Sequence, residues 1–294
     1  MGELQNSGIA DVAGKTTGKA TDQPCHVIAV VNQKGGVAKT TTTITLGAAL
    51  AKRGMKVLLV DCDPQGGVAS YLGLTETEVD ELETTLLSKI IAIVKKEEYD
   101  PYEGILHNKE GMDLMPSNIE LADSEVIMQN AFTREKILKE FIDSLRDSYD
   151  FILIDCGPSL GLLTYNALTA TDEVLIPINA CYASELGLRR LFATISRVKK
   201  KLNRRIQIAG VLFTQVDARP KYARETVESV RGAYSEHINI FNTVIPANVK
   251  VTEAVSVGET VLAYDGKSRG AQAYLALADE VMQLYGYTKE DNNG

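Results

Sequence analysis

Apolar residues gather in seven short runs along the chain, each of a length typical of a β-strand. Runs such as 57–60 and 151–154 are apolar at every position instead of alternating with polar residues. Such runs are typical of strands whose two faces are both covered, as in a mostly parallel sheet. The predicted strands are 26–32, 56–61, 112–115, 150–155, 173–178, 206–213 and 241–245.

Longer segments with helical patterning separate these runs. The alternation of strands and helices predicts an α/β fold of three layers, in which a mostly parallel, twisted sheet is flanked by helices. The acidic and irregular segment 75–110 receives no assignment. The predicted helices are 39–53, 133–147, 160–170, 185–202, 220–235 and 268–285.

Three segments with polar motifs directly follow predicted strands, namely residues 33–40, 61–67 and 155–161. The carboxyl ends of parallel strands lie at one edge of a sheet, and ligands of open α/β sheets bind at that edge. The pattern therefore predicts one ligand site that is built from all three segments.

Composition favours a soluble protein with one large core. The chain has 294 residues, of which 45% are hydrophobic, and no apolar run approaches the ~20 residues that span a bilayer. Residues 1–24 lack the apolar core of a signal peptide and are expected to form a disordered tail. We expect a single domain over residues 25–287 and a polar tail over residues 288–294.

The cysteines do not have the spacing of metal ligands, and three of them adjoin strand-like runs. They are therefore expected to be buried thiols in a reducing cytoplasm. The four are Cys25, Cys62, Cys156 and Cys181.

Charge is distributed unevenly along the chain. The net charge is −8, with 15 Lys and Arg against 24 Asp and Glu in residues 1–150, and 16 against 15 in the remainder. An acidic protein is a poor general binder of nucleic acids, but residues 189–205 contain eight basic residues and no acid. The protein is thus predicted to be acidic with a local basic face.

The segment after the first strand has the layout of a phosphate-binding loop that leads into a helix. Its glycines let backbone N–H groups turn toward an anion, its second lysine reaches the β- and γ-phosphates, and its first threonine ligates Mg²⁺. The predicted ATP-binding residues here are Lys34, Gly35, Gly36, Val37, Ala38, Lys39, Thr40 and Thr41.

The loop departs from the common pattern of such loops, which has glycine where Gln33 and Ala38 stand, and it carries an additional lysine, Lys34. This form, K-G-G-x-x-K-[TS], resembles the deviant Walker A motif of the ParA/MinD ATPases, and the chain is similar to the ParA/Soj partitioning proteins within them. The resemblance covers residues 25 to about 285 and makes the predicted domain a P-loop ATPase domain. Its further landmarks are the segments 61–66, 154–161, 217–219, 245–248 and 267–271.

Acidic residues end two of the predicted strands. Asp155 follows four apolar residues, which is typical of a Walker B acid that holds Mg²⁺. The resemblance implies that Asp63 lies in a switch loop, where it positions the attacking water and lies near the metal. The predicted metal-site residues are therefore Thr40, Asp63 and Asp155, and the predicted catalytic residues are Lys34, Lys39 and Asp63.

Lys34 has two interpretations. It is either a solvated loop lysine or, as the resemblance implies, a lysine that crosses a dimer interface to the phosphates of the partner subunit. The second interpretation is favoured because another cation at one nucleotide is otherwise redundant. If position 38 requires a positive φ, Ala38 carries a steric cost there. The family usually has asparagine and proline where Gly67 and Gly157 stand.

The resemblance also implies that Pro246 and Asn248 lie near the adenine of ATP. In this family the ATP-bound dimer binds double-stranded DNA without sequence preference through basic residues of the carboxyl-terminal part. A basic run alone is equally typical of a solvated helix face. The candidate DNA-binding residues are Arg189, Lys199, Lys200, Lys201, Arg219, Lys221, Lys250, Lys267 and Arg269.

The expected function is that of an ATPase for DNA segregation, slow alone and stimulated by a ParB-like centromere-binding protein. ATP and Mg²⁺ are the expected cofactors, and the expected location is the bacterial cytoplasm at the nucleoid. Residues 1–24 are too short for an additional DNA-binding domain. The alternatives are a MinD-like positioning ATPase, a P-loop regulator without DNA binding, and a small-molecule synthetase. The polar end of the chain lacks a basic amphipathic helix and disfavours membrane binding.

Overall fold

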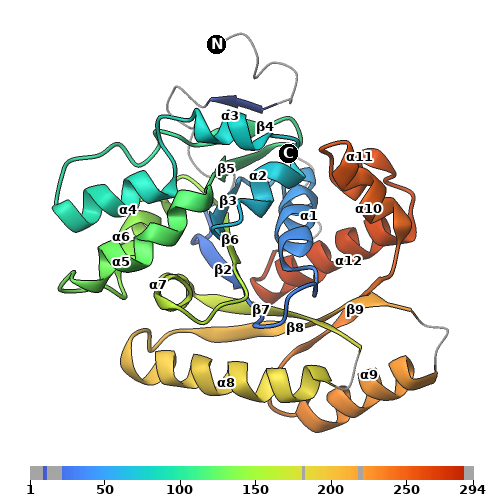
Figure 1. Cartoon of the computed structure of the whole chain (residues 1–294). Helices are drawn as coiled ribbons and strands as arrows, with labels where there is room; N and C mark the ends of the chain where they lie inside the picture. Colours follow the sequence, from blue (N-terminus) through green and yellow to red (C-terminus); the bar gives the residue numbers. More distant parts are fainter. Residues whose placement is uncertain (1–8, 12–21, 181–182, 218–220, 288–294) are drawn as a thin grey trace.

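One sheet runs through the described part of the chain, which comprises residues 9–11, 22–180, 183–217 and 221–287 of the computed structural model (Figure 1). Its nine strands lie in the order β1-β4-β5-β3-β6-β2-β7-β8-β9. Strand β4 is antiparallel to β1 and β5, and all other neighbouring pairs are parallel. The strands are β1 (Ile9–Asp11), β2 (His26–Val30), β3 (Val57–Cys62), β4 (Leu106–Asn108), β5 (Met112–Met115), β6 (Phe151–Cys156), β7 (Glu173–Asn179), β8 (Gln207–Val216) and β9 (Ile240–Pro246).

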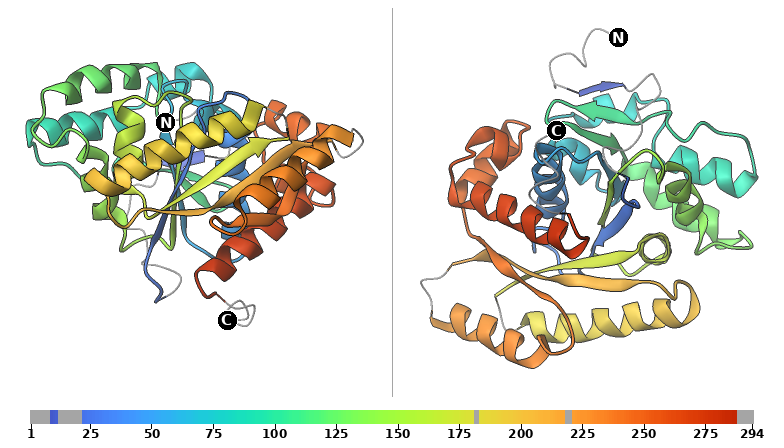
Figure 2. Two further views of the ribbon diagram at one scale, coloured as in Figure 1. Left: turned by 90° about the horizontal axis from the view of Figure 1, so that it is seen from below. Right: turned by 180° about the vertical axis from the view of Figure 1, so that it is seen from behind.

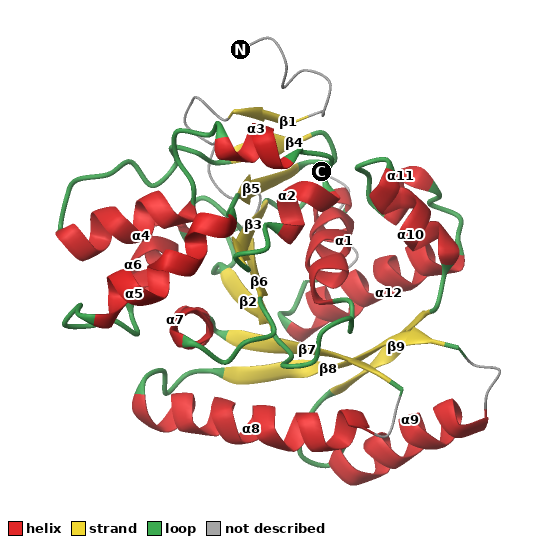
Figure 3. Cartoon of the chain, viewed as in Figure 1, coloured by secondary structure: helices red, strands yellow, loops and turns green. Residues whose placement is uncertain are grey.

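Helices connect the parallel strands and cover both faces of the sheet (Figures 1 and 3). They are α1 (Lys39–Lys52), α2 (Gly67–Tyr71), α3 (Glu76–Asp80), α4 (Leu86–Lys95), the 3₁₀ helix η2 (Ile119–Asp123), α5 (Ser124–Gln129), α6 (Ile137–Leu145), α7 (Leu162–Ala170), α8 (Ala183–Lys201), α9 (Lys221–Tyr234), α10 (Val249–Ser256), α11 (Val261–Tyr264) and α12 (Arg269–Leu284).

The predicted α/β fold is confirmed, and every predicted strand and helix has a counterpart in the structure. The short strands β1 and β4, the 3₁₀ helix η2 and the short helices α2, α3, α5, α10 and α11 were not predicted. Segment 75–110, which received no assignment, contains α3, α4 and β4. Strand β1 lies within the segment that was expected to be a disordered tail, and residues 1–8, 12–21 and 288–294 lie outside the described residues.

Side chains that alternate along each central strand enter two different cores. On β2, Val27 and Ala29 pack into a core with helices α4, α6, α7 and α8, whereas Ile28 and Val30 pack into a core with α1 and α12. Both faces of the strand are therefore buried, which explains why its sequence is apolar throughout. Figure 2 shows the two helical layers on opposite sides of the sheet.

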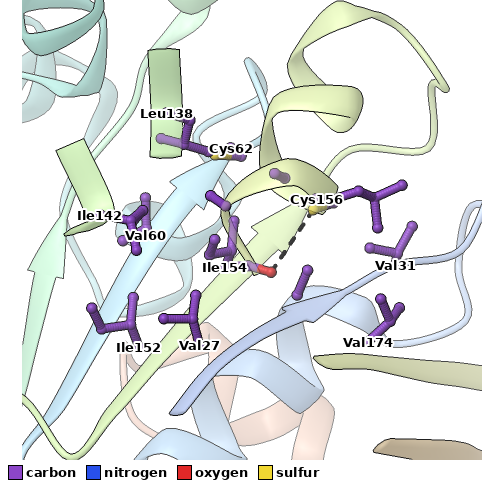
Figure 4. Packing of buried hydrophobic residues seen from close by; sticks show 14 of the residues in the cluster. Val27, Val31, Val60, Cys62, Leu138, Ile142, Ile152, Ile154, Cys156 and Val174 are labelled. Atoms are coloured by element: carbon purple, nitrogen blue, oxygen red, sulfur yellow. Dashed lines mark hydrogen bonds between the residues drawn. The ribbon is translucent and has the colours of Figure 1, made fainter. Parts of the chain in front are cut away.

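Cysteines occupy the first of these cores. Cys62 ends β3 beside Val60 and Leu138, and Cys156 ends β6 beside Val31 (Figure 4). Burial raises the pKa of both thiols, so both stay protonated at neutral pH. The prediction of buried thiols is confirmed for Cys25, Cys62 and Cys156, and Cys181 lies outside the described residues.

Helix α1 lies close against the sheet because it has glycine at position 47. A Cβ atom there would lie 2.7 Å from Leu59 Cδ2 and 3.0 Å from Met112 Sδ. Both neighbours are fully buried, so neither has free space to move into. This close contact fixes the distance between α1 and the sheet, and with it the position of the loop that precedes the helix.

We predict that Gly47→Val lowers the free energy of unfolding by about 1–3 kcal/mol, because the added methyl groups overpack this contact. The matched control is Ala51→Val, one turn further along α1 at a partly exposed position, which carries the same β-branched penalty. Urea unfolding measures both variants. An equal loss of unfolding free energy in the two variants would contradict the close contact at Gly47.

Candidate functional site

The loop between β2 and α1 is held in a conformation that exposes its backbone. Gly36 has a φ of 70°, and a Cβ added to Gly35 or Gly36 would meet nothing within 4 Å. Ala38 caps α1 with a φ of 61° and provides no side-chain hydrogen bond to the helix. The first N–H groups of α1 are thus left for an anion, as at other helix N-termini that bind phosphate.

Ala38 carries the steric cost that was expected for a positive φ. A left-handed conformation costs a non-glycine residue roughly 1–2 kcal/mol. Hydrogen bonds with the neighbouring strands β7 and β8 hold the loop in place. The Thr214 hydroxyl donates to the Val37 carbonyl at 3.0 Å, and Asn32 Nδ2 donates to the Pro177 carbonyl at 2.7 Å. The backbone N–H of Lys34 donates to Asn32 Oδ1 at 3.0 Å.

The two lysines of the loop point to different places. Lys39 is buried, and its ammonium lies 3.5 Å from the Lys34 carbonyl, across the mouth of the loop. Lys34 is partly exposed, and its ammonium donates instead to Asn179 Oδ1 at the end of β7, at 3.0 Å. The two ammonium groups thus have different partners: that of Lys39 lies at the backbone of the loop, and that of Lys34 at the end of the neighbouring strand β7.

Asp155 accepts hydrogen bonds from two hydroxyls of α1. The Thr40 hydroxyl donates to its Oδ2 at 2.6 Å, and the Thr43 hydroxyl donates to its Oδ1 at 3.1 Å. The carboxyl group is fully buried, which raises its pKa to about 6, although both hydrogen bonds and the positive charge of Lys39 act in the opposite direction. The predicted metal residues Thr40 and Asp155 are therefore in direct contact.

The loop after β3 is fixed by Asp61, a residue that was not predicted to belong to the site. Its two carboxylate oxygens accept from the backbone N–H groups of Asp63 and Val68, both at 3.0 Å. Asp61 is fully buried, and burial together with the neighbouring Asp155 raises its pKa. The Ser117 hydroxyl donates to the Asp63 carbonyl at 2.8 Å and supports the loop from behind.

The structure brings Asp63 next to the loop that follows β6. A Cβ added to Gly157 would lie 3.3 Å from the Asp63 carboxylate, so the absence of a side chain at position 157 makes room for it. A Cβ added to Gly67 would be in ordinary contact, 3.5 Å from Thr40 Cγ2. Segments 33–40, 61–67 and 155–161 thus meet at one edge of the sheet, as their positions after strands predicted.

The oxygen groups of this edge suit a hard divalent cation. Thr40, Asp63 and Asp155 offer a hydroxyl and two carboxylates, which are ligands of the type that Mg²⁺ prefers. Within the described residues no three His, Cys, Asp or Glu side chains form a cluster that could hold a metal alone. A Mg²⁺ ion here would therefore take most of its ligands from phosphate oxygens and water, which is the usual arrangement for this ion.

A cavity of ≈ 760 Å³ lies beside the phosphate loop. Ala38 and Thr41 line it on one side, and Pro246 and Asn248 line it on the other. Its wall is mainly apolar, which suits a flat aromatic base. The residues that were predicted to lie near the adenine are thus adjacent to the predicted phosphate site. Gln215, which has a φ of 53° and belongs to the segment 214–217 that the resemblance also places near the base, lines this cavity too.

The predicted DNA-binding residues fall into two groups. Arg189 and Lys199–Lys201 are exposed on α8, whereas Lys250, Lys267 and Arg269 are exposed near α10 and α12, which cover the other face of the sheet. Lys250 also forms an ion pair with Glu253 at 2.7 Å. Arg219 and the side chain of Lys221 lie outside the described residues.

Helix α8 spreads its own basic residues over a long distance. It runs from the carboxyl end of β7 back to the start of β8, which is parallel to β7. Lys199–Lys201 therefore lie at the amino edge of the sheet, about 24 Å along the helix from its beginning. The phosphate loop lies at the opposite edge, so only the first part of α8 is near it.

Comparisons with known proteins agree with this geometry. A family model described as an AAA domain matches residues 25–208. The sporulation initiation inhibitor protein Soj of Bacillus subtilis is 42% identical over 258 residues, which cover 87% of this chain and 97% of Soj. The chromosome partitioning protein ParA of Myxococcus xanthus is 40% identical over 260 residues, which cover 88% of each chain.

A solved structure is also similar over most of its length. It is a cobyrinic acid a,c-diamide synthase from Mycobacterium smegmatis with bound ADP and magnesium. The two chains share 34% identity with a TM-score of 0.76, and the match covers 89% of this chain and 95% of the synthase. Among the described residues, no helix is both long and apolar enough to cross a membrane.

We predict that Asp155→Asn flattens the dependence of stability on pH between about 4 and 6 in protein free of nucleotide and metal. An unfolded aspartate has a pKa near 3.9, whereas burial raises that of folded Asp155 to about 6. The folded state therefore holds this proton more tightly, which stabilises the wild type below about pH 4, and this contribution is lost as pH rises through 6.

Thermal unfolding in the presence of a chelator, at pH steps from 4 to 7, measures this effect. The matched control is Glu97→Gln, which neutralises an exposed acid. If the stability of Asp155→Asn falls with rising pH as steeply as that of the wild type, the raised pKa of Asp155 is contradicted.

Proposed function

Because the chain belongs to the ParA/Soj family of partitioning ATPases, we propose that it hydrolyses ATP to segregate DNA. In this proposal it binds ATP with Mg²⁺, forms a dimer around the nucleotide, and binds double-stranded DNA without sequence preference as that dimer. A ParB-like centromere-binding protein stimulates hydrolysis, and the protein works on the nucleoid in the bacterial cytoplasm. The observation that carries the proposal is that the two lysines have different partners, Lys39 the backbone of the phosphate loop and Lys34 the side chain of Asn179.

The roles proposed for the two lysines differ because their surroundings differ. Lys39 is buried at the loop and neutralises the phosphates of its own nucleotide. The ammonium of Lys34 is bound by Asn179 instead, and in this proposal a second subunit that docks on this edge presents its own Lys34 to the same phosphates. A cation supplied by a neighbouring subunit acts like an arginine finger, which stabilises charge that develops during phosphoryl transfer.

Hydrolysis would depend on positioning instead of covalent chemistry. Mg²⁺ bound with ATP would neutralise phosphate charge, and Thr40 and Asp155 are the residues that would hold it. Asp63 lies on a loop fixed by Asp61 and Ser117, where its carboxylate can orient a water molecule toward the γ-phosphate. Asn248 and Pro246 would contact the base in the adjacent cavity.

Dimerisation explains how a protein of net charge −8 could bind DNA. A single subunit presents its basic residues in two separated groups, whereas a dimer doubles each group on one particle. Phosphate contacts by lysine and arginine give affinity without sequence readout, and two linked patches bind far more tightly than one. We propose that Arg189, Lys250, Lys267 and Arg269 contribute, together with Arg219 and Lys221. Lys199–Lys201 lie at the opposite edge of the sheet from the phosphate loop.

A second candidate function is the synthesis of a small molecule, because one similar structure is a diamide synthase. That function requires a second substrate beside ATP, and its turnover would depend on that substrate. A partitioning ATPase responds instead to DNA and to a partner protein. The response of binding and turnover to DNA therefore separates the two functions.

The proposal predicts DNA binding that depends on the bound nucleotide. In gel-shift assays with ATP, with ADP and without nucleotide, we expect a shift of random-sequence duplex DNA only with ATP. Raising salt from 50 to 200 mM should weaken it at least about ten-fold, because counterions are released from the phosphates. Binding that is equal in all three states, or absent from all, would contradict the proposal.

If Lys34 acts on the nucleotide of the partner subunit, its loss should affect dimerisation and turnover but leave ATP binding by the monomer in place. Lys34→Ala should abolish ATP-dependent dimers and lower turnover by about 10³-fold, the loss expected for a missing arginine finger. Binding of ATP by the monomer should remain measurable because Lys39 is intact. Sedimentation and nucleotide titration measure the two activities, and Lys52→Ala at the exposed end of α1 is the control. A Lys34→Ala protein that dimerises normally would refute this role.

A further inference from the structure

Strands β3 and β6 end at the same level of the sheet. Their last residues, Cys62 and Cys156, are partners in the parallel register, so the next residues along the chain, Asp63 and Gly157, leave the sheet side by side. In the proposed function Asp63 orients the attacking water. Gly157 is one of the positions at which the sequence departs from the residue that is usual in the family. The side chain that is missing at position 157 therefore bears directly on the ATPase site.

The carboxylate of Asp63 uses the space that a side chain at position 157 would fill. A Cβ atom added to Gly157 would lie 3.3 Å from Asp63 Cγ and Oδ1, and 3.5 Å from Oδ2. Carbon atoms in contact are optimally about 3.5–4.0 Å apart, so Asp63 would have to move by some tenths of an ångström. The proline that is usual in the family also carries a Cβ atom here, and it would crowd the carboxylate in the same way.

The backbone of Asp63 is held from both sides. Its N–H donates to Asp61 Oδ1 at 3.0 Å, and its carbonyl accepts from the Ser117 hydroxyl at 2.8 Å and from the Gly66 N–H at 3.0 Å. Asp61 is fully buried, so this anchor belongs to the core. Crowding at position 157 would therefore displace the carboxylate instead of the backbone, and it would strain the hydrogen bond of 3.1 Å that Asp63 Oδ1 accepts from the Gln65 N–H.

This carboxylate lies close to the predicted metal-binding residues. Burial raises the pKa of Asp155 to about 6, and repulsion by the charge of Asp63 acts in the same direction. Asp155 in turn accepts the hydrogen bond of Thr40, so the three predicted metal-site residues share one edge of the sheet. Asp63 is partly exposed, and water can reach it. A carboxylate in this place is suited to orient a water molecule.

We propose that Gly157 is a positioning residue of the ATPase site. Because position 157 carries no side chain, the carboxylate of Asp63 lies where it can orient the attacking water. This role rests on the proposed function, which assigns the water to Asp63. Misplacement of a reacting group by about 1 Å can lower a rate by about 10²-fold, so a displacement of some tenths of an ångström should lower it about five-fold.

A double-mutant cycle tests the contact without any nucleotide. Urea unfolding is measured for the wild type, Gly157→Ala, Asp63→Ala and the double variant. Gly157→Ala should be more unfavourable to the unfolding midpoint in the wild-type background than in the Asp63→Ala background, because only the first contains the crowded carboxylate. The effect of alanine on the unfolded chain is the same in both backgrounds and cancels. An equal change of midpoint in the two backgrounds would overturn the contact.

The matched control is Gly266→Ala, in the turn between α11 and α12. A Cβ atom added there would also be crowded, since it would lie 3.0 Å from the Leu262 carbonyl, which is its one neighbour within 4 Å among the described residues. The control therefore carries a similar steric cost without a contact to Asp63. It should change the unfolding midpoint by the same amount in the wild-type and Asp63→Ala backgrounds.

Turnover of ATP with Mg²⁺ tests the consequence for catalysis. Gly157→Ala should lower kcat about five-fold and leave the KM for ATP unchanged, because Lys39 and the phosphate loop are not altered. Gly266→Ala should change neither constant. A kcat of Gly157→Ala equal to that of the control, or a fall in kcat that is matched by a rise in KM, would overturn the positioning role.

Failure of the proposed function would give a different result. A wild type that hydrolyses no ATP would contradict that function, and with it the role of Asp63. The unfolding cycle would still decide whether position 157 accommodates the carboxylate, because it requires neither nucleotide nor turnover.

Discussion

Two buried carboxylates, Asp61 and Asp155, lie opposite each other on the neighbouring strands β3 and β6, and the rest of the site depends on this register. Burial and mutual repulsion both disfavour their charged forms. Hydrogen bonds compensate, from the backbone of the following loop to Asp61 and from Thr40 and Thr43 to Asp155. One carboxylate thereby shapes the loop of Asp63, and the other anchors the start of α1. The same crowding of negative charge favours a cation at this edge.

In the proposed function one subunit alone lacks part of the active site, and the reason is the arrangement of its cations. Lys39 lies at the phosphate loop, whereas Lys34 donates to Asn179 at the end of β7, and the exposed basic residues are divided between two layers of the fold. A dimer around ATP would bring a second Lys34 to each nucleotide and would double the basic surface.

The sequence predicted most of this fold and site because the strongest signals are local. Continuous apolar runs marked the buried strands, and the motifs after them marked the ligand edge. The roles of Asp61, Thr43 and Asn179 were not predictable, since each depends on a contact with a distant segment or on strand register. Helix α4 was not predicted because its apolar run suits a strand as well as a helix. The burial of its Lys89 against the Asp100 carbonyl was not predictable either, because it depends on a contact with another segment. The separation of the basic residues could not be predicted from the sequence, because it depends on α8 running antiparallel to β7 and β8.

The central claim is that each ATPase site takes a lysine from the opposite subunit. Mixing two inactive variants tests it directly: Lys34→Ala, which keeps its own phosphate lysine, and Lys39→Ala, which keeps the lysine that it presents to a partner. The account predicts that the mixture hydrolyses ATP well above the sum of the separate proteins, because each mixed dimer contains one complete site. A rate equal to that sum would contradict the account.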